Sequence, residues 1–141
     1  MFRRTLIVTA IALLAASLPA CGESSEEKAT AKLCDARAGI AEEVDQLKAI
    51  SVTTATSSKI SASLQSIRDD LSTIAEARGD LSDERRAQVD KANDAFAATV
   101  TDLAGTLLKT TSLEQGRAEI ETALAGLATS YRDSLGTIDC P

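Results

Sequence analysis

The sequence predicts an all-α protein, an antiparallel up-down bundle of four helices. Four long stretches carry apolar residues three or four positions apart, which is the spacing of one face of an α-helix. No stretch shows the alternation of apolar and polar residues that is typical of a half-buried strand. Because the links between the four stretches are short, consecutive helices should run antiparallel.

The first helix is expected over residues 31–50. Charged side chains occupy most of its other faces, as in an amphipathic helix. Residues 51–56, Ser-Val-Thr-Thr-Ala-Thr, then predict a loop, because β-branched and hydroxyl side chains lower helix propensity. The predicted apolar face consists of Leu33, Ala36, Ile40, Val44, Leu47 and Ile50.

The second helix has the clearest periodicity in the chain. Thr56 or Ser57 is a suitable N-cap, since a hydroxyl there can accept a bond from a free backbone N–H. Gly79 is expected to end the helix in the left-handed conformation that glycine tolerates. The apolar positions step by four, three, four and three residues: Ile60, Leu64, Ile67, Leu71 and Ile74.

A third helix is predicted over residues 83–109, capped by Ser82. Asp83 and Glu84 lie near its N-terminus, where negative charge interacts favourably with the helix dipole. Its apolar face is expected to comprise Val89, Ala92, Phe96, Val100, Leu103 and Leu107.

The fourth helix should begin almost at once. Residues 111–114, Thr-Ser-Leu-Glu, have the form of a capping box. The buried face of this helix is predicted to consist of Leu113, Ile120, Leu124, Leu127, Tyr131, Leu135 and Ile138.

Residues 1–20 have the layout of a secretory signal, with Arg3 and Arg4 ahead of an apolar run and small residues. The apolar part is shorter than the ~20 residues that a membrane-spanning helix needs. The stretch Leu18-Pro19-Ala20-Cys21 resembles a bacterial lipobox, although Pro19 departs from the usual small residue. The resemblance implies cleavage before Cys21 and a diacylglycerol chain on its sulfur. The alternative is ordinary signal cleavage after residues 15–17, with Cys21 a chance cysteine.

These observations predict three segments: a lipoprotein signal peptide over residues 1–20, an acylated acidic tether over 21–30, and a four-helix bundle domain over 31–141. Two or three acyl chains on Cys21 would hold the protein firmly on a membrane, because each buried CH₂ contributes about 0.8 kcal/mol. The expected location is therefore extracytoplasmic, at the outer face of the cytoplasmic membrane, with membrane lipid as a partner through Cys21.

Two cysteines remain, Cys34 near the start of the first helix and Cys140 at the end of the last. In an exported chain such a pair predicts a disulfide. An even number of antiparallel helices brings the two chain ends together, so this bond favours four helices over three. The complete prediction is an up-down four-helix bundle stapled by Cys34–Cys140. A redox-active or zinc-binding pair is disfavoured, since neither a Cys-x-x-Cys motif nor four ligands are present.

The composition excludes most catalytic chemistry. The 141 residues include no histidine and no tryptophan, and the single methionine is Met1. Histidine acid/base catalysis, histidine metal sites and haem ligation by histidine or methionine are therefore excluded. The net charge of −6 becomes two units more negative when Arg3 and Arg4 leave with the signal, which disfavours nucleic-acid binding.

Carboxylates are plentiful, and paired acids can hydrolyse glycosides or hold calcium where they converge on a pocket. Here they occupy the polar phases of the predicted helices, so a solvated surface is the better interpretation. No serine-nucleophile motif is present either, and we expect no enzyme, cofactor or metal. The pairs are Glu42–Glu43, Asp69–Asp70, Asp83–Glu84, Asp90–Asp94 and Glu119–Glu121.

Most of residues 33–141 resemble the small exported helical proteins common in actinobacteria. The likeness rests on a cysteine in the first helix, the break at Val52-Thr53, and the terminal Asp139-Cys140-Pro141. That group is largely uncharacterised, so the resemblance implies no activity. We expect a non-enzymatic, membrane-anchored cell-envelope lipoprotein that acts as a structural or protein-interaction module on another envelope protein. The alternative is a carrier of a small apolar ligand in the bundle core, and an enzyme with an unfamiliar site ranks last.

Overall fold

The computed structural model describes residues 22–141, so the predicted signal peptide and Cys21 lie outside the described residues. The described part contains four long helices and no strand, which confirms the all-α prediction. The helices are α1 (Ser25–Ala49), α2 (Ser57–Ala77), α3 (Asp83–Lys109) and α4 (Leu113–Asp133), with short 3-10 turns η1 (Thr54–Thr56), η2 (Arg78–Asp80) and η3 (Leu135–Thr137).

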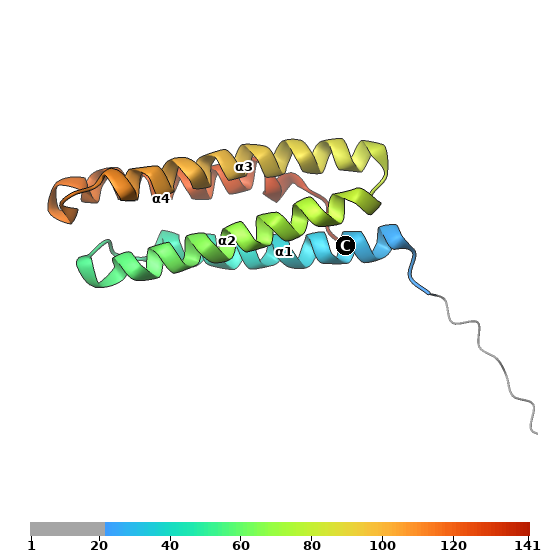
Figure 1. The fold of residues 1–141 in the computed structure, drawn as a ribbon, viewed down its shortest axis with the longest axis horizontal. Coiled ribbons are helices and arrows are strands. Elements are labelled where there is room, and N and C mark those ends of the chain that lie inside the picture. Colours follow the sequence, from blue (N-terminus) through green and yellow to red (C-terminus); the bar gives the residue numbers. More distant parts are fainter. Residues whose placement is uncertain (1–21) are drawn as a thin grey trace, which may run out of the picture.

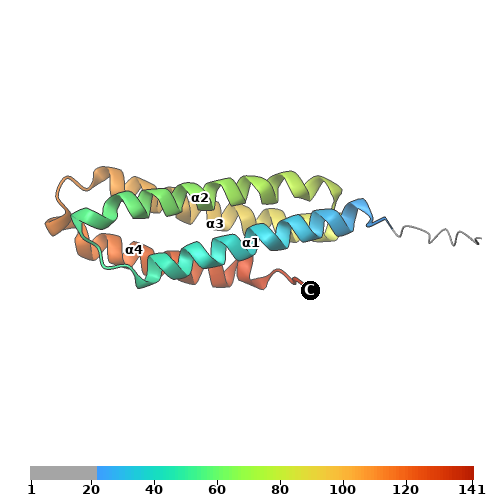
Figure 2. The same ribbon diagram turned by 90° about the horizontal axis from the view of Figure 1, so that it is seen from below.

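The four helices form an antiparallel up-down bundle. In Figure 1, α1 and α2 make one layer and α3 and α4 the other, and Figure 2 shows the same arrangement from below. Each helix packs on the two that neighbour it around the bundle, α1 on α2 and α4, and α3 on α2 and α4. The predicted topology is therefore confirmed.

The bundle has two ends of different construction. The disulfide end, as we call it, contains the start of α1, the α2–α3 connection (residues 78–82) and the C-terminal residues 134–141. The loop end contains the α1–α2 connection (residues 50–56) and the α3–α4 connection (residues 110–112). No helix among the described residues is long and apolar enough to cross a membrane.

One continuous core runs between the two layers. Phe96 of α3 is completely buried and meets the ring of Tyr131 edge-on, with ring centroids 5.8 Å apart. The predicted core face of α2 is buried throughout. Four residues of the predicted core faces are only partly buried, because they lie near helix ends: Ile50, Leu107, Leu113 and Tyr131. The large side chains below 2% exposure are Phe96, Leu33, Ile40, Leu47, Ile60, Ile67, Ile74, Leu103, Ile120, Leu127, Leu135 and Val52.

The first helix begins six residues earlier than predicted. Ser24 Oγ accepts a bond from the Glu27 N–H at 3.1 Å, and the Glu27 carboxylate accepts one from the Ser24 N–H at 2.7 Å. This capping box satisfies two backbone donors at the start of α1. Residues 25–30 are consequently helical and Ala29 is buried, so the predicted tether over 21–30 is wrong for this part.

The other predicted caps are wrong in detail. The hydroxyls of Thr56, Ser82 and Ser112 make no capping bond to a helix N–H, although each residue directly precedes a helix. Gly79 is not left-handed, since no described residue has a positive φ, and it lies in η2. In η2 the carbonyls of Arg78 and Gly79 accept hydrogen bonds from the Arg86 side chain.

The α1–α2 connection is more ordered than the predicted loop. Val52 is buried, and Thr56 Oγ1 accepts a bond from the Thr53 N–H at 2.8 Å and donates to the Ser51 carbonyl at 2.9 Å. At the other end of the chain, α4 stops before the predicted Leu135. That residue lies in η3 and is still buried, because the turn folds back onto the core.

Candidate functional site

The disulfide joins α1 to the C-terminal residues. Cys34 and Cys140 are bonded across a sequence separation of 106, with their Cα atoms 5.7 Å apart. The predicted bond is therefore confirmed. Cys21 is the only cysteine of the chain outside this bond, and it lies outside the described residues.

Two side chains bind the C-terminal backbone to α1. The Arg37 guanidinium donates to the carbonyls of Leu135 at 2.9 Å and Gly136 at 3.3 Å. The Tyr131 hydroxyl donates to the Arg37 carbonyl at 3.3 Å. Burial raises the pKa of the Tyr131 hydroxyl, and the neighbouring Arg37 charge acts in the opposite direction. These bonds place the last residues against α1, where Cys34 can reach Cys140.

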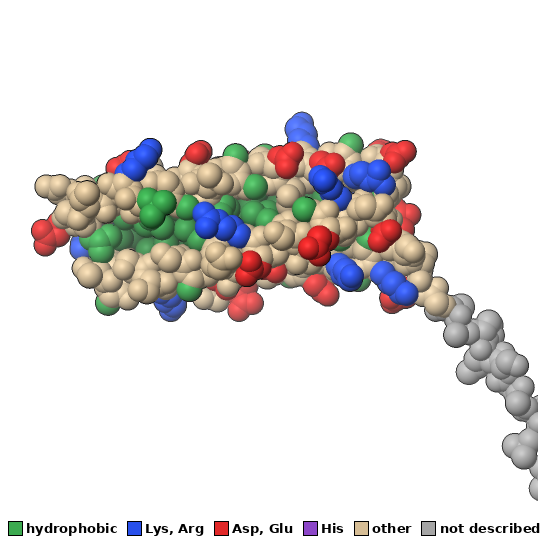
Figure 3. Space-filling model, in the orientation of Figure 1, with side chains coloured by type: hydrophobic (Ala, Val, Ile, Leu, Met, Phe, Trp, Pro, Cys, Tyr) green, Lys and Arg blue, Asp and Glu red, His purple; other side chains and the backbone are tan. Residues whose placement is uncertain are grey.

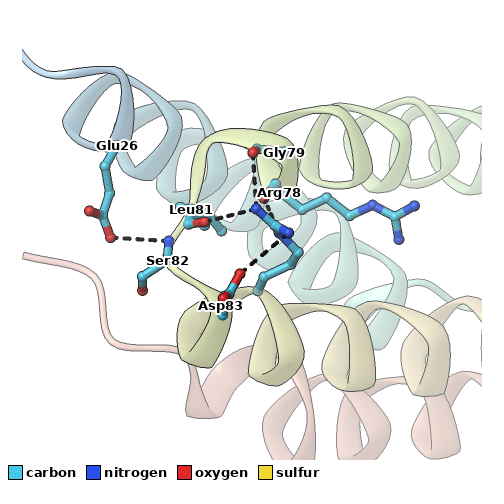
Figure 4. A network of polar contacts seen from close by, with 7 residues as sticks. Glu26, Arg78, Gly79, Leu81, Ser82 and Asp83 are labelled. Atoms are coloured by element: carbon cyan, nitrogen blue, oxygen red, sulfur yellow. Dashed lines mark hydrogen bonds and ion pairs between the residues drawn. The ribbon is translucent and has the colours of Figure 1, made fainter.

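A second arginine orders the α2–α3 connection, as Figure 4 shows. The Arg86 guanidinium donates to the carbonyls of Arg78, Gly79 and Leu81, each at 3.1 Å. A cationic donor makes a stronger hydrogen bond than a neutral one. These contacts hold η2 and the residue that follows it against the start of α3.

The start of α1 also contacts the α2–α3 connection. The Glu26 carboxylate accepts a bond from the Ser82 N–H at 3.3 Å, which Figure 4 draws. Arg85, three residues further on, donates to the Asp139 carbonyl at 2.7 Å. Three segments that are far apart in the sequence are thereby joined at the disulfide end.

A surface hollow of about 740 Å³ lies at the disulfide end between the start of α1 and the C-terminus. Its charged lining is acidic with one guanidinium, and it includes no hydroxyl or thiol paired with a base that could activate it. No group of three or more potential metal ligands occurs among the described residues. The lining comprises Glu23, Ser24, Glu26, Glu27, Thr30, Ala31, Cys34, Asp35, Arg85 and Pro141.

Most of the acid pairs predicted from the sequence lie on the surface and do not converge. Asp90 forms an ion pair with Arg78 at 2.9 Å, and Asp83 lies 3.6 Å from Arg86. The exposed members are Glu42, Asp69, Asp83, Glu84, Asp94, Glu119 and Glu121.

Glu43, Asp70 and Asp90 are only partly exposed, and Asp70 is the one that faces the backbone of α1. It turns toward α1, where a Cβ atom added to Gly39 would lie 2.6 Å from Asp70 Oδ2. Burial raises the pKa of Asp70, and the nearby charges of Glu43 and Asp69 raise it further. Gly39 is thus the place where the α1 backbone makes room for a carboxylate of α2. The sequence signal that could have revealed it is a glycine inside an otherwise strong helical pattern.

Parts of the chain that meet at the loop end lack acids, although Glu114 lies in the first turn of α4. The sequence has no Asp or Glu over residues 46–68 or 103–113, although the whole chain is acidic. Leu108 of α3 is 88% exposed, and it is the one exposed large hydrophobic residue in the described part. The exposure of Leu108 was not predicted from the sequence. The pair Leu107-Leu108 could have revealed it, because two adjacent residues of a helix point in different directions. Only one of the two leucines can therefore point directly into the core.

Figure 3 shows where apolar side chains reach the surface. On the face drawn there, hydrophobic side chains form a recessed strip between the two layers of helices, mostly toward the loop end. Two regions therefore combine several features of a site, the acidic hollow at the disulfide end and this apolar strip. Comparison of the chain with known proteins gives no match to a protein-family model, a curated protein or a solved structure.

Proposed function

We propose that this chain is a non-enzymatic lipoprotein of the bacterial cell envelope, exported and anchored at the outer face of the cytoplasmic membrane, whose bundle is a protein-interaction module. One observation carries the proposal. The structure pairs Cys34 with Cys140, and the remaining Cys21 stands in a stretch that resembles a lipobox. Disulfides persist in oxidising compartments outside the cytoplasm, which agrees with export.

The position of α1 supports a close attachment. Because α1 begins at Ser25, only three residues separate Cys21 from the helix, and three residues span at most about 10 Å. An acyl chain on Cys21 would thus hold the disulfide end beside the lipid headgroups. α3 has 27 residues, so the loop end would be presented up to about 40 Å away.

The interior supports a binding surface over a carrier. Phe96, Leu103 and Ile120 are fully buried between the layers, and an apolar ligand in the core would have to displace such side chains. The hollow of about 740 Å³ lies at the surface and not between the layers, and charged residues are part of its lining. Carriage of a small apolar ligand stays the alternative prediction.

The experiment is metabolic labelling in a bacterial host with an alkyne analogue of palmitate, followed by membrane fractionation and mass spectrometry. We expect the wild-type chain to be labelled, to sediment with membranes, and to start at Cys21 with the mass of its acyl groups. The Cys21→Ser variant should lose the label.

The matched control is the double variant Cys34→Ser/Cys140→Ser, which alters the other two cysteines. It should keep the label and the membrane association, because Cys21 is unchanged. A wild-type protein that is exported, cleaved elsewhere and unlabelled would overturn the proposal.

A further inference from the structure

One flank of α3 is directed toward α2, and an ion pair identifies it. Asp90 bonds Arg78, which follows α2 directly. Ala97 and Ala104 follow Asp90 at intervals of seven residues, or about two helical turns, and Leu108 comes one turn later. These four residues therefore form one line along α3. The line is tied to α2 at the disulfide end, and at the loop end it finishes on the exposed Leu108.

The facing flank of α2 is identified in the same way. Asp70 is directed toward Gly39 of α1, and residues two apart on a helix differ in direction by about 200°. Arg68 consequently lies on the opposite flank, toward α3, and Ser61 lies two turns earlier on that flank. Arg68 is exposed and forms no ion pair with any residue in the described part of the chain.

We define the apolar strip by the residues that the helical register places on these two flanks: Ser61, Arg68, Ala97, Ala104 and Leu108. Figure 3 shows hydrophobic side chains recessed between the two layers of helices. Ala97 and Ala104 are partly buried hydrophobic residues that pack against the core, so their outer sides remain accessible. Small side chains let a second helix approach closely. The strip thus combines small side chains, the exposed Leu108 and the guanidinium of Arg68, which forms no ion pair in the described part of the chain.

From this geometry we propose that the strip receives an amphipathic α-helix of a protein partner, with leucine-type residues on Ala97, Ala104 and Leu108 and an Asp or Glu beside Arg68. Charge complementarity selects this occupant, since Arg68 has no partner and residues 46–68 and 103–113 contain no acid. The inference rests on the proposed function in that it names the surface of the interaction module. Helices commonly bind such surfaces through anchors three or four residues apart.

A second copy of this chain fits less well. A twofold dimer buries the same patch on both subunits, so it would place two Arg68 side chains in one apolar interface. Like charges in that position are unfavourable. A partner that supplies carboxylates has no such conflict.

The test uses the full chain in nanodiscs of zwitterionic lipid and two labelled synthetic peptides of 18 residues. The peptides share one Leu/Ala face, and one carries Glu and the other Lys along its rim. Fluorescence anisotropy, with empty nanodiscs as blank, should show saturable one-to-one binding of the Glu peptide. Its affinity should exceed that of the Lys peptide by about tenfold or more, since charge pairs determine the choice of partner.

Two surface variants test the strip. Arg68→Glu should reverse the preference, so that the Lys peptide binds more tightly than the Glu peptide. Leu108→Ser should lower the affinity for the Glu peptide by about tenfold, because it removes the exposed leucine. Lys91→Glu is the matched control, since Lys91 lines a hollow shared with α4 on the other flank of α3. It should leave both affinities within about twofold of the wild type.

Four results would overturn the inference. Equal affinities for the two peptides would contradict the role given to charge. Binding of neither peptide would contradict a helix-binding strip. If Lys91→Glu and Arg68→Glu changed the peptide affinities equally, the binding would depend on the net charge of the protein and not on the strip. Self-association that Leu108→Ser abolishes would assign the strip to a second copy. The palmitate labelling of Cys21 is unaffected by these variants, so the inference and the proposed function fail separately.

Discussion

The two ends of the bundle are held in different ways. At the disulfide end, Cys34–Cys140 crosslinks the chain and the guanidinium groups of Arg37 and Arg86 bind backbone carbonyls. At the loop end, the connections rely on neutral bonds such as that from the Thr53 N–H to Thr56 Oγ1. Covalent and charge-assisted contacts therefore concentrate at the disulfide end, and the exposed leucine, Leu108, lies toward the opposite end. The comparison teaches that the two ends differ in how firmly they are held, and that the exposed apolar surface lies away from the more firmly held end.

The largest expected effect concerns the crosslink. The double variant Cys34→Ala/Cys140→Ala should lower the free energy of unfolding by about 2–5 kcal/mol, because the bond restricts the unfolded chain over a separation of 106 residues. Urea unfolding measures this. Adding a reductant should destabilise the wild type and leave the variant unchanged. An equal stability of wild type and variant would remove the main difference between the two ends.

Arg86→Gln tests the second contact of the disulfide end. It removes charged donors from the carbonyls of Arg78, Gly79 and Leu81, which should cost about 1.5 kcal/mol because Arg86 is partly exposed. Thermal unfolding measures the loss. Arg132→Gln is the control, since Arg132 pairs only with its exposed neighbour Asp133 and should change stability by less than about 0.5 kcal/mol. Equal losses in both variants would contradict the role given to Arg86.

Two glycines of α4 sharpen the comparison at the loop end. A Cβ added at Gly116 would collide with the Thr110 side chain of the α3–α4 connection, so Gly116→Ala should destabilise by about 1 kcal/mol. Gly126 has open space around it, and Gly126→Ala should stabilise by about 0.5–1 kcal/mol through better helix propensity. Urea unfolding of both variants measures the sign of each change in the free energy of unfolding. If Gly116→Ala also stabilised, the connection would be looser than described.

The smallest effect is a pH dependence in the middle of the bundle. Burial and the charges of Glu43 and Asp69 raise the pKa of Asp70 in the folded state above its value in the unfolded chain. The folded state then holds this proton more tightly, so the stability contributed by Asp70 is full at low pH and is lost as the pH rises through its folded pKa. Asp70→Asn should therefore stabilise slightly at neutral pH, by about 0.5 kcal/mol or less.

The matched measurement for Asp70→Asn is urea unfolding at neutral pH and again below the ordinary pKa of an aspartate. The gain should be present in the first condition and vanish in the second. Asp94→Asn, on an exposed position of α3, should show no gain at either pH. A gain that persists at low pH would show that the shift at Asp70 is not its cause.

The helical periodicity of the sequence was sufficient for the fold. The core faces of α2 and of most of α3 are buried as predicted, because a spacing of three and four residues directly records which side of a helix meets the core. The disulfide was predicted from the two cysteines that remain in a chain expected to be exported, and the bond in turn favoured four helices over three. Ser24 and Glu27 carried a capping-box signature that was overlooked, since the stretch is acidic and has little apolar periodicity.

Other features could not be predicted from local sequence. Gly79 was predicted as a left-handed cap, but α2 continues into the 3-10 turn η2, whose carbonyls accept hydrogen bonds from Arg86 of the next helix. Arg37 and Leu135 are 98 residues apart, and no local sequence pattern around either residue predicts their hydrogen bond. The apolar strip likewise depends on how the two layers of helices are placed, which periodicity does not specify.

The most direct test of the difference between the two ends is hydrogen exchange on the full chain, resolved by residue. We predict that backbone N–H groups near Cys34 and in η2 exchange only through global unfolding, with the full free energy of unfolding. Groups in the connections at residues 50–56 and 110–112 should exchange through smaller local openings. Equal protection at both ends, or weaker protection near Cys34, would contradict the account.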